Sequence, residues 1–174
     1  MSQHRVVITG LGAITPLGLT VNEFWQGLIN GTSGIGPITK FDTSKYPVKV
    51  AAEVKGFEPT NYMDIKRVDR TALCTQYAIA ATKMALATAQ LDTSKEKPER
   101  IGVIIATTGA MHLLIDQGEV LKNRGPMRID PLLLSKVAPS MVPTIVGLEF
   151  GLKGPNSSVN SACASGNDAL GTAL

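Results

Sequence analysis

The ten residues from Ser157 to Gly166 constrain this chain more than any other stretch of its sequence. They predict a short strand over 157–161, a tight turn and the start of a helix, with Cys163 at the corner. The residues that flank the corner are all small: Ser161, Ala162, Ala164, Ser165 and Gly166. A strand can enter a helix through so sharp a bend only where bulky side chains are absent, as in folds that place a serine nucleophile on an elbow. We therefore expect Cys163 to lie at the N-terminus of a helix that continues through 167–170.

This position gives Cys163 a chemical interpretation and leaves a structural one open. The first N–H groups of a helix have no partner within it, and the helix dipole is positive at that end. Both stabilise negative charge on a sulfur atom, and the thiolate is the attacking form of cysteine. The alternative is a small buried cysteine that fills a gap in the core. The other cysteine, Cys74, lies beside Leu73 in an alanine-rich helical segment, and we expect it to be a core residue.

Apolar runs typical of strands alternate with helical segments along the chain. Buried strands are expected over 5–9, 101–107 and 157–161, and an edge strand or hairpin arm over 48–54. Residues 32–47 are expected to form a loop and 59–64 a short helix or turn. Helices are expected over 111–123 and 140–150, with Pro143 in the first turn of the latter and Gly151 as its end. This alternation indicates an α/β fold with a mostly parallel sheet.

The longest helical pattern covers 69–90. The residues expected to form its apolar face are Leu73, Tyr77, Ala80, Ala81, Met84 and Leu91. Because many of its residues are alanines, other elements can approach this helix closely, so we expect it between two layers of the fold.

The run from Thr9 to Gly12 resembles the start of a dinucleotide-binding motif but lacks its spacing. Thr15 occupies the place of the third glycine, and Pro16 follows it. A helix is expected only at Thr20, where a capping-box pattern ends at Glu23. We therefore expect no nucleotide cofactor here, and no cofactor or metal elsewhere in the chain.

Composition excludes several classes of protein. The 174 residues carry a net charge of +3, too weak to indicate nucleic-acid binding, and no arginine-rich run is present. Two cysteines do not form a disulfide scaffold, and neither a signal peptide nor a membrane-spanning run is apparent. We expect a cytoplasmic protein that does not interact with membranes. Only 18% of residues are charged, which suits a chain that packs against another half or subunit.

Several blocks of the sequence closely resemble the 3-oxoacyl-acyl carrier protein synthases of the thiolase superfamily, and most closely the elongating type II enzymes. The blocks that carry this resemblance are 6–18, 31–35, 41–44, Gly154-Pro155 and 160–166. The resemblance implies a thiolase-like layered fold with helices on both faces of the sheet. It also implies that residues 1–174 are the N-terminal half of a longer, homodimeric enzyme, ending at Leu174 within the nucleophile helix.

The resemblance also implies a reaction. Cys163 would accept an acyl group from acyl carrier protein, and a malonyl thioester would lose carbon dioxide and attack that group. The backbone N–H of Cys163 would be one oxyanion donor. The family's second donor and its two catalytic histidines come from the C-terminal half; His4 and His112 match neither histidine motif.

Two binding features follow from position in the family's pattern. Thr108 and Gly109 match the stretch that lines the acyl-chain pocket, although a plain strand-to-helix turn explains the glycine equally well. Lys66, Arg67 and Arg70 match the docking patch for acyl carrier protein, with a solvated charged face as the alternative. We expect this cluster at a helix start, where basic residues gain nothing from the dipole. Asp69 departs from the family's pattern, which often has a basic residue there.

Two other functions stay open on the sequence. One is a polyketide-type ketosynthase from the same superfamily. The other is a non-catalytic module that binds carrier protein, which would apply if the natural chain ends at Leu174.

Overall fold

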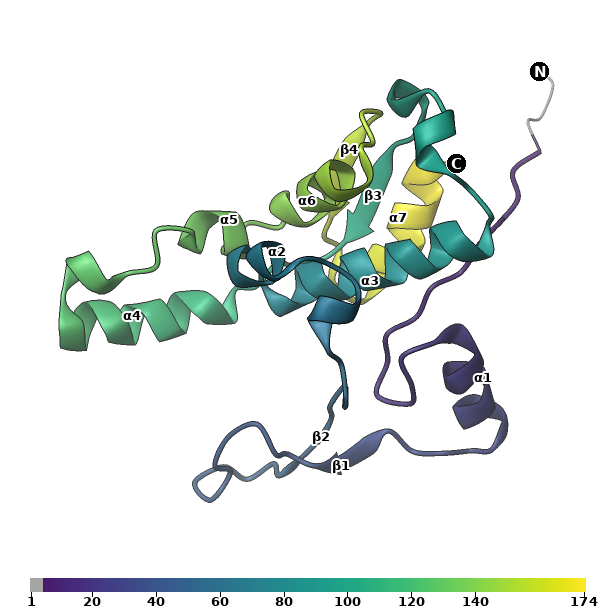
Figure 1. The fold of residues 1–174 in the computed structure, drawn as a ribbon. Coiled ribbons are helices and arrows are strands. Elements are labelled where there is room, and N and C mark those ends of the chain that lie inside the picture. The colour runs from purple at the N-terminus through teal and green to yellow at the C-terminus, as the bar shows by residue number, and fades with distance from the viewer. Residues whose placement is uncertain (1–4) are drawn as a thin grey trace.

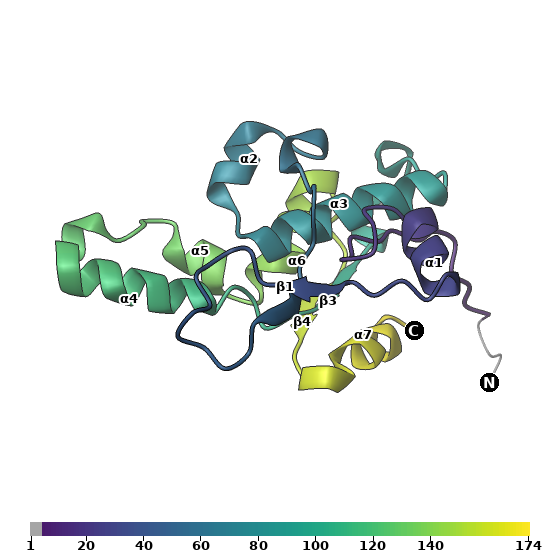
Figure 2. The same cartoon turned by 90° about the horizontal axis from the view of Figure 1, so that it is seen from below.

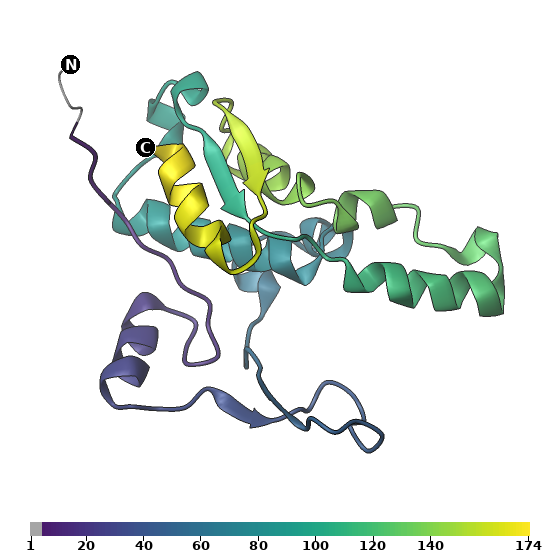
Figure 3. The same cartoon turned by 180° about the vertical axis from the view of Figure 1, so that it is seen from behind.

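A pair of parallel strands forms the centre of the molecule in the computed structural model, which describes residues 5–174. Strand β3 (Val103–Ala106) pairs with β4 (Asn156–Val159), with Val103 opposite Asn156 and Ala106 opposite Val159. Helix α6 (Met141–Phe150) packs on one face of the pair and α7 (Ser165–Ala173) on the other, as Figures 2 and 3 show. Helix α3 (Leu73–Thr88) packs against α6 on its side of the strands. The α/β layering expected from the sequence is confirmed.

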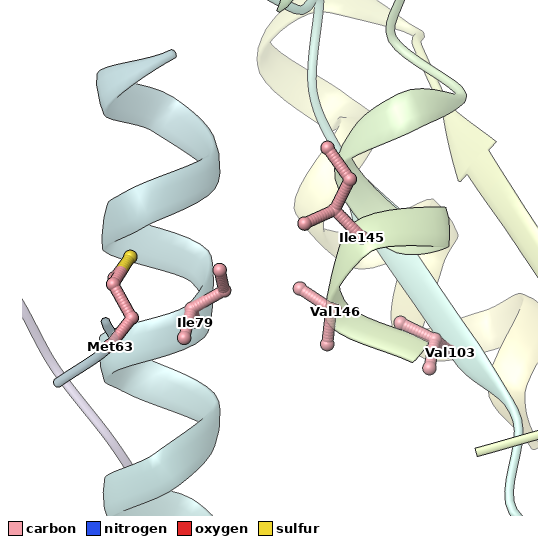
Figure 4. Close-up of a cluster of buried hydrophobic side chains, with 5 residues drawn as sticks. All are labelled: Met63, Ile79, Val103, Ile145 and Val146. Carbon is pink, nitrogen blue, oxygen red and sulfur yellow. The ribbon is translucent and has the colours of Figure 1, made fainter. Parts of the chain in front are cut away.

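The core lies where α3, α6 and β3 meet. Figure 4 shows its five buried side chains, Met63, Ile79, Val103, Ile145 and Val146. Ile79 is completely inaccessible to solvent, and Val146 is only 1% exposed. Together these side chains hold α3 and α6 over the face of the strand pair.

The apolar face predicted for the long helix is only partly confirmed: Ala80 is buried, and Tyr77, Ala81, Met84 and Leu91 are half-buried. The buried residues of α3 are Thr75, Gln76, Ile79 and Ala80, whereas Leu73 is 39% exposed. The side-chain amide of Gln76 donates to the carbonyls of Val68 and Thr71, each at 3.1 Å. A polar side chain can be buried when its hydrogen bonds are satisfied, which apolar periodicity does not detect.

The helix predicted over 69–90 is in fact two helices. Helix α2 (Ile65–Arg70) begins at Asp64, whose carboxylate accepts from the Arg67 N–H at 3.0 Å. Thr71 and Ala72 are extended, and α3 starts after them. The short 3-10 turn η1 (Pro59–Asn61) precedes α2, as expected for 59–64.

The strand predicted over 5–9 is wrong: these residues are extended without a ladder, and Ile8 is 77% exposed. Within the described part of the chain no strand pairs with them. The chain then crosses α3 closely at Gly10 and Gly12. A Cβ at Gly12 would lie 1.9 Å from the Ala81 carbonyl oxygen, and one at Gly10 would lie 2.1 Å from that of Ala85. The glycines therefore allow backbone-to-helix contact, and the alanines of α3 leave room for it.

The next two elements form as expected. Helix α1 (Val21–Ile29) is capped by Thr20, whose hydroxyl accepts from the Glu23 N–H at 3.1 Å. Gly31, with φ of +64°, follows the end of α1. Strand β2 (Val50–Ala52) is the predicted hairpin arm, and it pairs antiparallel with β1 (Ile35–Pro37), which lies inside the expected loop.

The segment that connects β3 to α6 along the chain forms a helical arm, which projects from the body of the molecule (Figure 1). It consists of α4 (His112–Arg124), the turn η4 (Pro126–Arg128) and α5 (Leu133–Val137). Gly125, at φ +81°, reverses the chain after α4. Lys136 donates to the carboxylate of Asp130 at 2.8 Å, and this bond lowers the pKa of Asp130.

The remaining connections are short. Two 3-10 turns, η2 (Thr93–Lys95) and η3 (Pro98–Arg100), lead into β3, and Gly151 ends α6 at φ +69° as expected. Within residues 5–174, no helix has the length and apolar character that crossing a bilayer requires.

The core arrangement yields a stability prediction. Ile79→Ala should lower the free energy of unfolding by about 2–5 kcal/mol, because it leaves a cavity between α3 and α6. Ile8→Ala, in the segment ahead of Gly10, is the matched control: Ile8 is 77% exposed, so its loss should change stability by about 0.5 kcal/mol or less. Urea denaturation of both variants measures this, and equal losses would contradict the assignment of Ile79 to the core.

Candidate active site

The chain turns sharply between β4 and α7, and Cys163 lies in that turn. Residues Ala162–Ala164 form a single 3-10 turn, η5, directly ahead of α7. Ala162 has φ of +52°, a left-handed conformation that residues with a Cβ seldom adopt. Figure 3 shows β3 and β4 ending at the same edge, with α7 beginning beside it. The predicted strand–turn–helix corner is therefore present.

Hydrogen bonds brace this corner from within. The Ser161 N–H donates to the Ser165 hydroxyl oxygen at 2.8 Å, and that hydroxyl donates to the Ala162 carbonyl at 2.7 Å. The Ser161 hydroxyl donates to the carboxylate of Asp168. Ser165 is buried, whereas a Cβ at Gly166 would meet open space. Crowding thus accounts for the small side chain at Ser165 but not for the glycine at 166.

Cys163 itself is accessible at this corner. Its side chain is exposed, which contradicts the alternative of a buried core cysteine. Among residues 5–174, no acceptor is found for its backbone N–H. A ligand at the turn could therefore meet both the sulfur and a backbone donor of the same residue.

Thr108 and Gly109 leave the sheet at the same edge as Cys163. The Thr107 N–H donates to the Val159 carbonyl at 3.1 Å, which continues the β3–β4 pairing beyond the strands. Gly109 has φ of +72°, and a Cβ there would lie 2.2 Å from the Val137 carbonyl oxygen. The turn itself therefore requires glycine, so Gly109 is not in itself evidence for a deep pocket. Thr108 is exposed.

The basic cluster lies on α2, in the outer layer of the molecule. Lys66 and Arg70 are exposed, but Arg67 forms an ion pair with Glu149 of α6, with 2.9 Å between Nε and Oε2. A hollow of about 170 Å³ is lined by these three cations and Asp64.

The expected position of this cluster at a helix start holds for Lys66, the second residue of α2, but not for the whole cluster. Arg67 and Arg70 lie in the last turn of the short helix α2, where positive charge is favoured by the helix dipole. The break after Arg70, which separates α2 from α3, produces this arrangement. The dipole therefore accounts for Arg67 and Arg70 without a partner, whereas Lys66, at the helix start, gains nothing from it.

The other candidates take no part in the corner. Cys74 lies on α3 and is only half-buried, less enclosed than a core residue. His112 is the exposed first residue of α4, and His4 lies outside the described residues.

Sequence reasoning missed two residues of the corner, Ser165 and Asp168. Ser165 was expected only to be small, and Asp168 only to continue the helix. The serine four residues after Ser161 is the one available signal, because a serine at a helix start can hydrogen-bond backbone groups three or four residues earlier. No spacing rule points to Asp168.

The difference in exposure between the two cysteines is testable. Iodoacetamide should alkylate Cys163 about tenfold faster than Cys74, since even a local opening cost of about 1.4 kcal/mol at Cys74 gives that ratio. Peptide mapping after brief treatment measures both sites, and the protein in guanidinium is the control, in which the rates should converge. Faster labelling of Cys74 in the folded protein would contradict the proposed accessibility.

Comparison with known proteins identifies the family. Residues 3–174 match the family described as "Beta-ketoacyl synthase, N-terminal domain". The chain is 38% identical over 175 residues to "3-oxoacyl-[acyl-carrier-protein] synthase 2" of Synechocystis sp., covering 100% of this chain and 42% of that protein. The protein of the same name from Coxiella burnetii is 36% identical over 174 residues, covering 99% of this chain and again 42% of the relative.

A solved structure agrees with these sequence relatives. "The ishigamide ketosynthase/chain length factor" superposes with a TM-score of 0.82 at 31% identity, covering 99% of this chain and 45% of that one. The chain thus spans less than half the length of the proteins that it matches. With a matching family model over nearly all its residues and a thiolase-like ketosynthase fold, this chain belongs to the beta-ketoacyl synthase family.

Proposed function

We propose that residues 1–174 form the N-terminal half of an elongating 3-oxoacyl-acyl carrier protein synthase, in which Cys163 holds the growing acyl chain. One observation carries this proposal: an exposed cysteine occupies a strained turn at the start of α7, in a chain of this family. The names of the curated relatives support a 3-oxoacyl synthase.

The first step is acyl transfer to Cys163. The thiolate attacks the carbonyl carbon of an acyl thioester, and the electron pair of the C=O bond moves onto oxygen. The Cys163 N–H, which has no acceptor within the described residues, donates to that oxyanion. Collapse of the intermediate expels the thiolate of the carrier and leaves a new thioester on Cys163. The covalent intermediate divides a difficult condensation into two easier steps.

The second step is carbon–carbon bond formation. A malonyl thioester loses carbon dioxide, and the resulting carbanion attacks the thioester carbonyl on Cys163. The C–S bond then breaks, which releases the 3-oxoacyl product and restores the thiolate. The second oxyanion donor and the two catalytic histidines are expected from the C-terminal half of the enzyme, which lies outside residues 1–174.

Recognition is proposed for two surfaces. Thr108, exposed at the edge where Cys163 lies, is assigned to the wall of the acyl pocket, together with the backbone at Gly109. Lys66 and Arg70 are assigned to carrier-protein docking because they are exposed and clustered around a hollow. Arg67 contributes to this surface chiefly by joining α2 to α6.

We further propose that the enzyme is a cytoplasmic homodimer. Both cysteines are thiols, as expected in a reducing compartment. Large apolar side chains are exposed on the α4–α5 arm, including Leu114, Ile115 and Leu134, which supports burial against another protein surface.

The role of Cys163 is tested by acylation. Incubation of the intact protein with an acyl-acyl carrier protein should add the mass of the acyl group to the peptide that contains Cys163. Cys163→Ala should abolish this transfer, a loss of at least about a thousandfold in rate, while Cys74→Ala retains it. Transfer that survives Cys163→Ala would disprove the assignment.

Docking is tested by charge reversal. Lys66→Glu with Arg70→Glu should weaken binding to acyl carrier protein about tenfold or more, and added salt should weaken the wild-type interaction. Lys97→Glu with Arg100→Glu is the matched control, because it makes the same charge change on exposed residues near η3. Equal effects of the two double variants would show general charge attraction rather than a docking site on α2.

The same assays separate the two alternatives. Preferential acylation by polyketide intermediates instead of saturated acyl chains would favour a polyketide-type ketosynthase. Binding of carrier protein with no acylation of Cys163 would favour a non-catalytic module.

A further inference from the structure

The peptide unit between Ala162 and Cys163 is held in an unusual orientation. Ala162 has φ of +52° although it carries a Cβ. The one other described non-glycine residue with positive φ, Gln90, follows the end of α3, where a left-handed residue commonly terminates a helix. Ala162 instead precedes a helix and adjoins Cys163, so its conformation needs compensation from the surrounding structure.

Ser165 supplies that compensation through three hydrogen bonds. Its hydroxyl and its backbone N–H both donate to the Ala162 carbonyl, the hydroxyl at 2.7 Å. The same hydroxyl accepts from the Ser161 N–H at 2.8 Å. Because Ser165 is only 8% exposed, water competes poorly for these bonds. One hydroxyl thus connects the residues on both sides of the bend.

The geometry of the peptide group extends this effect to Cys163. The Ala162 carbonyl and the Cys163 N–H belong to one planar trans peptide unit, so they point in opposite directions. When Ser165 holds the carbonyl toward α7, the N–H of Cys163 is directed away from α7. This N–H is the donor assigned above to the oxyanion.

Asp168 supports the same arrangement. It lies three residues after Ser165 in the first turn of α7, where the helix dipole favours a carboxylate. It accepts from the Ser161 hydroxyl and so fixes the residue whose N–H reaches Ser165. Ser161, Ser165 and Asp168 therefore form one connected network around the bend, which we call the corner network.

We propose that the corner network positions the Cys163 N–H for oxyanion stabilisation, with Ser165 as the principal positioning residue and Asp168 as its support. This inference rests on the proposed function. It predicts that loss of the network impairs acyl transfer, which forms an oxyanion, more than alkylation, which forms none.

The experiment compares these two reactions of the same sulfur. In the intact protein, Ser165→Ala should lower the single-turnover rate of acyl transfer to Cys163 about tenfold, since it removes the hydroxyl's two hydrogen bonds in a buried setting. The rate of iodoacetamide alkylation should change less than about twofold. Asp168→Ala, at an exposed position where misfolding is less of a risk, should show the same selectivity with a smaller loss. Thermal unfolding of each variant checks that the fold is retained.

Thr172→Ala is the matched control. The Thr172 hydroxyl donates to the Asp168 carbonyl at 2.7 Å on the same helix but does not belong to the corner network. Its removal should leave both rates unchanged. A parallel fall of acyl transfer and alkylation in Ser165→Ala would show a general structural role and overturn the inference.

The remaining outcomes separate this inference from the proposed function. If the wild-type protein is acylated and both Ser165→Ala and Asp168→Ala are acylated equally fast, the inference alone is overturned. If the wild type is alkylated at Cys163 but never acylated, the proposed function fails, and the inference fails with it.

Discussion

In a parallel pair both strands run in the same direction, so the residues that follow β3 and those that follow β4 leave the sheet at one edge. The register from Val103–Asn156 to Ala106–Val159 fixes which residues these are. Thr108 and Gly109 follow one strand, and Cys163 follows the other. They come from segments more than fifty positions apart in the sequence. The backbone pairing therefore brings the candidate acyl wall and the candidate nucleophile to the same edge of the strand pair, independently of their side chains.

The pairing is in turn held from its two faces by different means. On one side, the enclosed side chains of Ile79, Val146 and Val103 join α3, α6 and β3. On the other, α7 packs against β3 while its N-terminal turn is tied to the end of β4 by Ser165. Helix α7, which follows the candidate nucleophile, is thus fixed at its start by hydrogen bonds with defined direction. This is the end at which a small rotation would most change the direction of the Cys163 N–H.

Sequence reasoning located the elements better than it located their faces. The corner at Cys163, the stop at Gly151 and the cap at Thr20 were predictable because each depends on a few adjacent residues. The buried face of α3 was predictable only in part, because Gln76 is buried through hydrogen bonds to Val68 and Thr71 across a helix break. The strand expected over 5–9 failed for a related reason. A strand requires a neighbouring strand to pair with, whereas a β-branched run indicates only that its own residues favour the extended conformation. Ser165 and Asp168 were not predicted, because their hydrogen bonds depend on the backbone dihedral angles of the bend, which the sequence does not reveal.

The candidate nucleophile and the candidate docking cluster of the proposed enzyme lie in different layers. Cys163 lies in the turn ahead of α7, which packs on one face of the strand pair, whereas Lys66 and Arg70 lie on α2, on the side of the other face (Figure 2). The ion pair between Arg67 and Glu149 connects α2 to α6, which packs on that other face. Changes at separated sites that share no partner add independently. The structure therefore allows carrier binding to vary through α2 without altering the corner that orients Cys163. Arg67 is the exception within the basic cluster, because its guanidinium contributes both to surface charge and to the attachment of α2.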